Sequence, residues 1–124
     1  MSPDRDILLV EDEGAIAEAL RRMLERAGYT VRVALDGKQA LAALGEAMPE
    51  VLILDLVLPR LGGFAVLEHM HQHHMTLPVI VITANPLYDD SLRYTAIVQV
   101  LIKPFPIEEL LAALRTIIAL PDPF

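Results

Sequence analysis

The sequence of 124 residues predicts an α/β fold, a doubly wound parallel sheet of five strands with helices on both faces. Short apolar runs alternate with segments of helical periodicity along the whole chain, as βαβ units require. Apolar residues make up 54% of the chain and the mean hydropathy is +0.45, which favours strands buried on both faces. Because no repeat or linker interrupts the pattern, we expect one domain over residues 1–124.

The first two strand–helix units are expected within residues 7–49. Residues 7–10 form a short apolar run, and residues 29–34 alternate in the manner of a second strand. Gly28 is a helix stop between them, while Asp36 is the expected N-cap of a second helix that Pro49 closes. The inner positions expected for the first helix are Ile16, Leu20, Met23, Leu24 and Ala27.

Residues 51–59 (VLILDLVLP) form the most strongly apolar run and contain a single carboxylate, Asp55. An ionised carboxylate is costly to bury without a partner, so we expect Asp55 at the carboxyl end of a buried strand. Sites in open α/β sheets are built at that edge. Taken alone, Asp55 is equally compatible with a residue that only caps the following loop.

The second half of the chain continues the alternation. Gly62 and Gly63 lead into a third helix, and Pro78 precedes a fourth strand over residues 79–83. Residues 85–96 have the weakest pattern, and we expect a loop and a short fourth helix there. A fifth strand is expected over residues 97–102. Pro106 marks the start of a last helix, whose apolar positions are Leu110, Leu111, Leu114, Ile117 and Ile118.

The composition argues against several classes of function. The net charge is -7, and no basic patch is present that would favour nucleic acid or an anionic membrane. The chain has no cysteine, which excludes disulfides and thiol catalysis. It shows neither a leader pattern nor an apolar run of about 20 residues, so we expect a cytoplasmic domain.

Polar residues follow four of the predicted strands. Glu11 and Asp12 follow the first strand, Asp55 and Thr83 end the third and fourth, and Lys103 follows the fifth. Because all carboxyl ends of a parallel sheet share one rim, these side chains can converge there. Each has a simpler interpretation, such as a helix-terminal acid, a β-former or a solvated lysine. Their coincidence favours a site that positions a phosphoryl group with Mg²⁺, or Mn²⁺, and accepts it on a carboxylate.

The chain resembles, from end to end, the receiver domain of bacterial two-component response regulators. The segments that carry the resemblance are residues 7–13 (ILLVEDE), 55–59 (DLVLP) with Gly63, 78–84 (PVIVITA) and 103–105 (KPF). The resemblance implies a flavodoxin-like sheet of strand order 2-1-3-4-5. It further implies a phosphorelay switch that is not an enzyme beyond catalysing its own phosphorylation and dephosphorylation.

The resemblance also assigns roles around the metal. It implies that Asp55 is the phosphoacceptor and a metal ligand, and that Asp12 binds Mg²⁺ directly. Glu11 would act on the metal mainly through water, and the backbone carbonyl of Val57 would be a further ligand.

Two further residues are assigned to the phosphoryl group. The resemblance implies that Thr83 follows the group on activation and that Lys103 pairs with it. The bond between Lys103 and Pro104 is expected to be cis, as is usual in the family.

The implied partners are proteins. A histidine kinase or a phosphotransfer protein would donate the phosphoryl group. An output domain, a downstream protein or a second copy would dock on the face of the fourth helix, fifth strand and last helix. No output domain is expected within these residues, which would be a complete receiver or part of a longer regulator.

The sequence departs from the family pattern near its output face. Val100 stands where an aromatic residue is common, and the chain between Thr83 and Lys103 is shorter than usual. Glu11 replaces the more frequent aspartate. We therefore expect the conformational response to pass through residues 84–96. A degenerate receiver that only docks, independently of phosphorylation, is the alternative.

The sequence disfavours two enzyme classes. A phosphatase of the haloacid dehalogenase type needs a second acid two residues after its nucleophile, and that position is Val57. Nucleotide-binding enzymes of the Rossmann and P-loop types need glycine-rich motifs that the chain lacks.

All four histidines of the chain lie within residues 69–74. His69 and His73 are four residues apart and could chelate a transition metal. The favoured interpretation is a solvated helix end, where imidazoles suit the C-terminal dipole.

Overall fold

A computed structural model describes residues 5–84 and 94–118, which form a five-stranded sheet and four helices. In chain order the elements are β1 (Asp6–Val10), α1 (Gly14–Arg26), β2 (Thr30–Ala34), α2 (Gly37–Glu46), β3 (Val51–Asp55), α3 (Gly63–Gln72), β4 (Val79–Thr83), β5 (Ile97–Ile102) and α4 (Ile107–Ile117). The short helix expected within residues 85–96 lies mostly outside the described residues.

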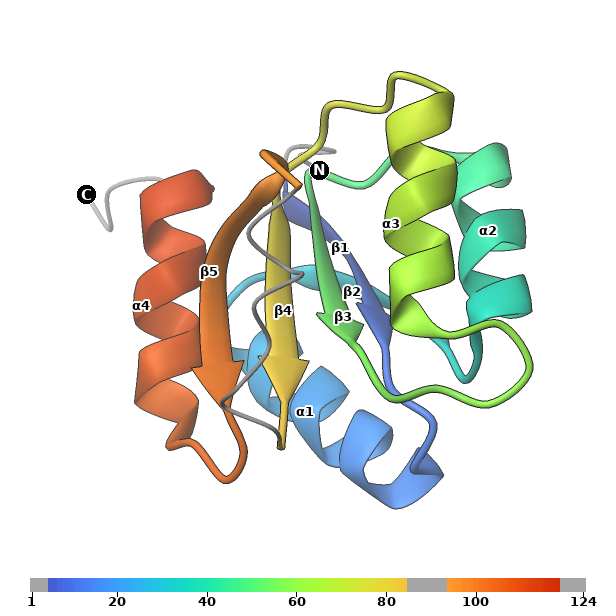
Figure 1. Ribbon diagram of the computed structural model, residues 1–124. Helices are drawn as coiled ribbons and strands as arrows, with labels where there is room; N and C mark the ends of the chain where they lie inside the picture. The colour runs from blue at the N-terminus through green and yellow to red at the C-terminus, as the bar shows by residue number, and fades with distance from the viewer. Residues whose placement is uncertain (1–4, 85–93, 119–124) are drawn as a thin grey trace.

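The sheet is parallel throughout and has the strand order β2-β1-β3-β4-β5, which confirms the predicted topology (Figure 1). The strands end almost in register, since Val10 pairs with Leu54 and Thr83 pairs with Ile102. The residues that follow the strands therefore meet at one rim, which lies at the bottom of Figure 1.

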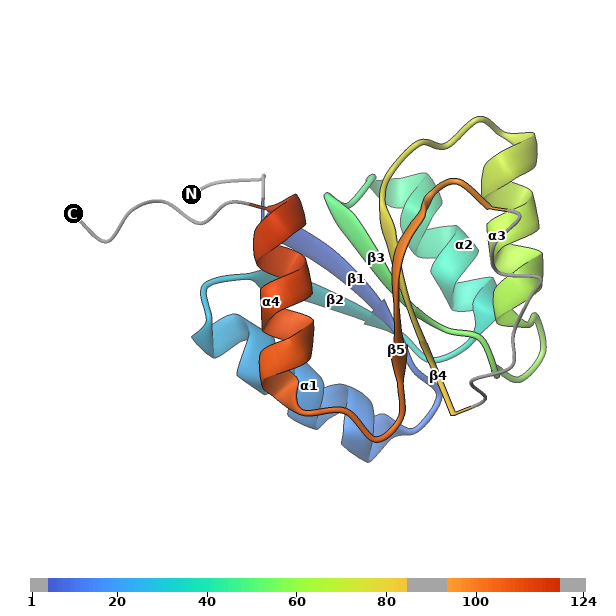
Figure 2. The same cartoon turned by 60° about the vertical axis from the view of Figure 1, so that its left-hand side comes forward.

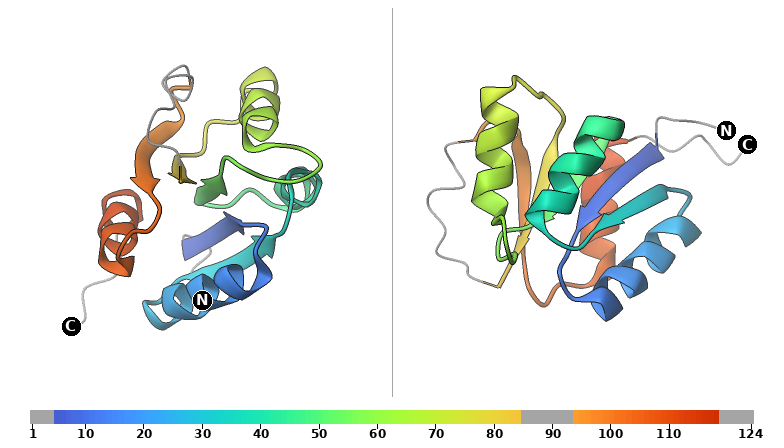
Figure 3. Two further views of the ribbon diagram at one scale, coloured as in Figure 1. Left: turned by 60° about the horizontal axis from the view of Figure 1, so that its bottom comes forward. Right: turned by 90° about the vertical axis from the view of Figure 1, so that its right-hand side faces the viewer.

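Helices cover the two faces of the sheet in pairs. Helices α1 and α4 pack on one face, and α2 and α3 pack on the other, as Figures 2 and 3 show. Alternate residues of each strand supply the two cores, because successive side chains point to opposite faces. In β1, Ile7 and Leu9 join the α1 and α4 side, while Leu8 and Val10 join the α2 and α3 side.

The expected helix boundaries are confirmed with small shifts. Gly28 has φ 107°, the left-handed conformation that a glycine after a helix end adopts at no steric cost. The Asp36 side chain accepts a hydrogen bond from the Gln39 backbone N–H at 2.8 Å, as an N-cap should. Pro106 is the N-cap residue of α4, one position before the helix. The Lys103–Pro104 peptide bond is cis, as expected.

The inner face of α1 differs from the expected one. The buried positions are Ala17, Leu20 and Leu24, whereas Ile16 and Met23 are each 39% exposed. The helix has more apolar residues than one face can bury, and Ile16 and Met23 are the ones left outside the buried stripe. This part of the prediction was wrong.

Strand β5 is the other departure from the expected burial. β3 and β4 are buried along their whole length, but Val98, Val100 and Ile102 of β5 are exposed. β5 is an edge strand, and α4 covers the opposite side of it, where Leu101 is buried. An apolar strip is therefore left on this edge among the described residues.

Candidate phosphoacceptor site

Three carboxylates converge at the carboxyl rim of the sheet. Glu11 and Asp12 follow β1, and Asp55 is the last residue of β3. One oxygen from each lies within 4.8 Å of the others. Glu11 and Asp55 are buried, while Asp12 is exposed. The structure thus brings together the three acids that the sequence predicted would converge.

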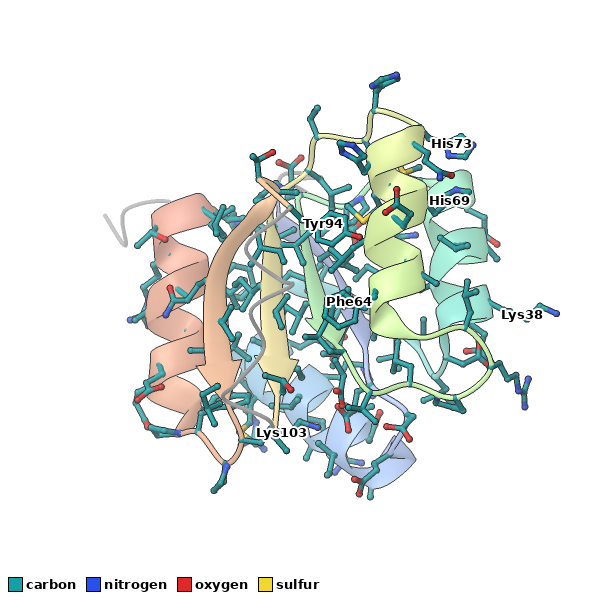
Figure 4. All side chains as sticks on the ribbon, in the orientation of Figure 1. Lys38, Phe64, His69, His73, Tyr94 and Lys103 are labelled. Carbon is teal, nitrogen blue, oxygen red and sulfur yellow. The ribbon has the colours of Figure 1, made fainter. Side chains whose placement is uncertain are left out.

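Lys103, which follows the edge strand β5, completes the cluster and is labelled at the lower end of the sheet in Figure 4. Its Nζ donates to Oδ2 of Asp55 at 2.8 Å and to Oε2 of Glu11 at 3.1 Å. The chain turns immediately after β5, so the side chain reaches back across β4 to β3. One ammonium group therefore partly neutralises two buried carboxylates, which would otherwise repel each other.

The electrostatics of the site follow from this burial. Burial and the adjacent Asp55 carboxylate raise the pKa of Glu11 from 4.5 to about 7, against the opposing effect of Lys103. Burial lowers the pKa of Lys103, but hydrogen bonds to Asp55 and Glu11 outweigh it and leave that pKa raised. The lysine stays charged at neutral pH, and the site keeps a cation next to Asp55.

The loop after β3 fixes the position of Asp55. The backbone N–H of Val57 donates to Oδ1 of Asp55 at 3.0 Å, so both carboxylate oxygens have a partner. Gly63 closes this loop against the strand end, and its N–H donates to the Leu56 carbonyl at 3.2 Å. A Cβ at Gly63 would lie 2.6 Å from the Leu56 Cα and 2.8 Å from the Asp55 carbonyl oxygen.

A second close approach holds the same loop from the side of α2. A Cβ on Gly37 would lie 1.9 Å from the carbonyl oxygen of Leu61, so only glycine fits there. Arg60, in the left-handed region at φ 65°, pairs with the Asp36 N-cap at 3.3 Å. Sequence reasoning missed these contacts, because a glycine inside a helix pattern does not show which distant backbone it touches.

Thr83 lies at the same rim and is fully buried as the last residue of β4. Its carbonyl accepts a hydrogen bond from the Lys103 backbone N–H at 2.8 Å, which ties the ends of β4 and β5 together. Val57 is 63% exposed beside Asp55, and its predicted carbonyl ligation of a metal stays a prediction.

The donor set fits a hard divalent cation. The converging ligands are carboxylate oxygens, which Mg²⁺ and Mn²⁺ prefer over nitrogen or sulfur donors. Asp12 is the exposed member of this cluster, while Glu11 and Asp55 are buried. None of the helices in the described residues is long and apolar enough to cross a membrane.

Comparisons with known proteins agree with this geometry. The response regulator receiver domain family matches residues 7–115. The response regulator MprA of Mycobacterium ulcerans is 38% identical over 114 residues, which cover 90% of this chain and 49% of that protein. The chain therefore spans about half the length of such relatives.

Solved structures give the same result. The receiver domain of the Francisella response regulator 1452 matches with a TM-score of 0.84 and 26% identity, covering 91% of this chain and 95% of that one. The response regulator protein TrrA of Thermotoga maritima, in complex with Mg(2+)-BeF, matches with a TM-score of 0.82 and 27% identity. That match covers 91% of this chain and 98% of TrrA.

Proposed function

The chain belongs to the response regulator receiver domain family, and on that premise we propose that Asp55 is its phosphoacceptor. Receiver domains are the phosphoaccepting signalling switches of two-component systems. The observation that carries the assignment to Asp55 is its hydrogen bond to Lys103 at 2.8 Å, at the end of the central strand. Among the clustered acids, Asp55 alone is held by both a cation and a backbone N–H.

The transfer is a nucleophilic substitution at phosphorus. An oxygen of the ionised Asp55 attacks the phosphorus of a donor phosphohistidine, and the P–N bond breaks. The electron pair leaves with the donor imidazole, which takes up a proton. The product is an acyl phosphate, whose added charge Lys103 Nζ neutralises from its present position.

Three carboxylates and an incoming phosphoryl group need more positive charge than one lysine supplies. We assign Asp12 and Asp55 as the direct ligands of Mg²⁺, with Glu11 acting through water and the Val57 carbonyl as a further ligand. When bound, the cation supplies charge neutralisation for the transferred group. Thr83 would then donate a hydrogen bond from its hydroxyl to a phosphoryl oxygen.

The partner that supplies the phosphoryl group is proposed to be a histidine kinase or a phosphotransfer protein in the cytoplasm. The domain would catalyse only its own phosphorylation and dephosphorylation. The receiving partner would be an output domain, a downstream protein or a second copy. The exposed Val98, Val100 and Ile102 on β5 support the proposed docking face, because a contiguous apolar strip is a common interaction surface. The expected response of residues 84–96 falls on a segment of which residues 85–93 lie outside the described residues.

Intact-mass measurement after incubation with acetyl phosphate and Mg²⁺ tests the assignment. The native chain should gain one phosphoryl group, and Asp55→Asn should gain none. Glu13→Gln is the matched control, because Glu13 is an exposed acid next to Asp12 but outside the three-acid cluster. Labelling of Asp55→Asn equal to native would remove Asp55 from its role. An unlabelled native chain would favour the docking module.

A further inference from the structure

The end of α3 carries a histidine pair that the phosphoacceptor site does not use. His69 lies in the last turn of the helix, and His73 is its C-cap residue. Figure 4 shows both at the carboxyl end of α3, on the side away from Tyr94. They lie far from the acidic rim, because α3 begins beside Asp55 and runs towards the other end of the sheet.

The two imidazoles are already gathered in one place. Their ring centroids are 4.0 Å apart and their planes differ by 23°. A tetrahedral ion bound at 2.0–2.1 Å to two nitrogens needs those nitrogens about 3.3 Å apart. Such a spacing requires the two rings to leave the stack, and His69 is partly exposed and His73 exposed at the helix surface.

The ring of His73 is also oriented. Its Nδ1 lies 2.9 Å from the backbone carbonyl oxygen of His69, which can only accept, so Nδ1 carries the proton. The lone pair of the neutral ring is therefore on Nε2. Metal-bound histidines commonly donate their other ring N–H to a backbone carbonyl, which fixes the tautomer and the ring plane in this way.

We propose that His69 and His73 form a binding site for a divalent transition metal ion of the Cu²⁺ and Zn²⁺ class. Imidazole nitrogen suits these ions, whereas Mg²⁺ prefers the oxygen donors of the rim. Two histidines four residues apart on one face of a helix are the ligand pair that some zinc-binding helices use. Water would occupy the remaining positions, giving one ion per chain at this pair.

The other two histidines provide the internal control. His71 lies on a different face of α3, edge-on to Tyr94 with ring centroids 6.4 Å apart. His71 and His74 line a cavity of about 310 Å³ between the end of α3 and the start of β5. They do not share the face of the stacked pair, so removing His71 should leave the proposed site intact.

Calorimetric titration with Cu²⁺ and Zn²⁺ salts tests the site, with millimolar Mg²⁺ present throughout to occupy the acidic rim. The native chain should bind one Cu²⁺ more tightly than Zn²⁺, as the order of divalent affinities requires. His69→Ala and His73→Ala should each lower the affinity for Cu²⁺ by at least about tenfold, because each variant loses a direct ligand. A loss of this size is typical even when only a partner of a metal ligand is changed. His71→Ala should bind as the native chain does.

Electron paramagnetic resonance of the Cu²⁺-loaded chain supplies a second readout. Coupling to two imidazole nitrogens is expected in the native chain and to one in either single variant. Circular dichroism of each variant checks that α3 is retained. The proposal is overturned if the native chain binds no Cu²⁺ at millimolar concentration, or if His71→Ala loses as much affinity as His69→Ala.

Discussion

Glu11 should make the metal-free domain less stable as the pH rises from about 4.5 to about 7. The folded chain holds a proton on Glu11 in this range that the unfolded chain has released, because the pKa of Glu11 is raised from 4.5 to about 7. Unfolding then releases a proton, and the free energy of unfolding falls with increasing pH. At roughly 1.36 kcal/mol per pKa unit, the interval corresponds to about 3 kcal/mol.

Glu11→Gln isolates this contribution, since glutamine keeps the shape but cannot ionise. Urea unfolding in the presence of a chelator, repeated between pH 4 and pH 8, gives the free energy of unfolding of both chains. The free energy of unfolding of the variant, relative to that of the native chain, should rise by about 3 kcal/mol between about pH 4.5 and about pH 7. Glu13→Gln, which changes an exposed acid, should follow the native curve. A difference that stays constant with pH, or that shrinks as the pH rises, would refute the assignment of the proton to Glu11.

Three further outcomes are expected. Gly63→Ala should lower the free energy of unfolding by about 1–3 kcal/mol, because its Cβ would lie 2.6 Å from the Leu56 Cα. Gly45→Ala is the control: a Cβ there has nothing within 4 Å, so this variant should raise the free energy of unfolding by about 0.5–1 kcal/mol. Urea midpoints that shift in the same direction for both variants would contradict this reasoning. Asp12→Asn should weaken Mg²⁺ binding in calorimetry, and undiminished affinity would place the metal elsewhere. Val57→Asn should speed loss of the phosphoryl group, followed by intact mass, because the exposed aliphatic side chain of Val57 cannot orient water; an unchanged rate would argue against local control.

The strands were accessible from the sequence because local pattern and tertiary role agree there, and their order was implied by the family resemblance. The apolar run of residues 79–83 coincides with β4, since a central strand must be apolar on both faces. The run of residues 97–102 coincides with the edge strand β5. α1 was harder, because Ile16 and Met23 are as apolar as the residues that pack. Which of them face the sheet depends on the crossing of the helix over β1 and β2, and that is a tertiary property.

The candidate site shows the same division. The sequence determined which groups stand at the strand ends, because a carboxylate or lysine that directly follows a buried strand lies at the rim where that strand ends. Folding alone decided that Lys103 spans to both Glu11 and Asp55, which lie 92 and 48 residues away in the chain. Burial of Glu11 beside Asp55 raises the pKa of Glu11 against the effect of Lys103, and no local pattern encodes that burial.

The sequence by itself determined a parallel α/β domain with three acids, a threonine and a lysine at one rim, because hydrophobic period and strand-end chemistry are local properties. The tertiary structure decided how the loop after Asp55 is held, since the contacts of Gly37 and Gly63 join backbone segments from separate elements. It also decided that β5 keeps an exposed apolar strip and that His69 and His73 stack. These features depend on which neighbours fill the space beside a residue, and only the packed chain supplies those neighbours.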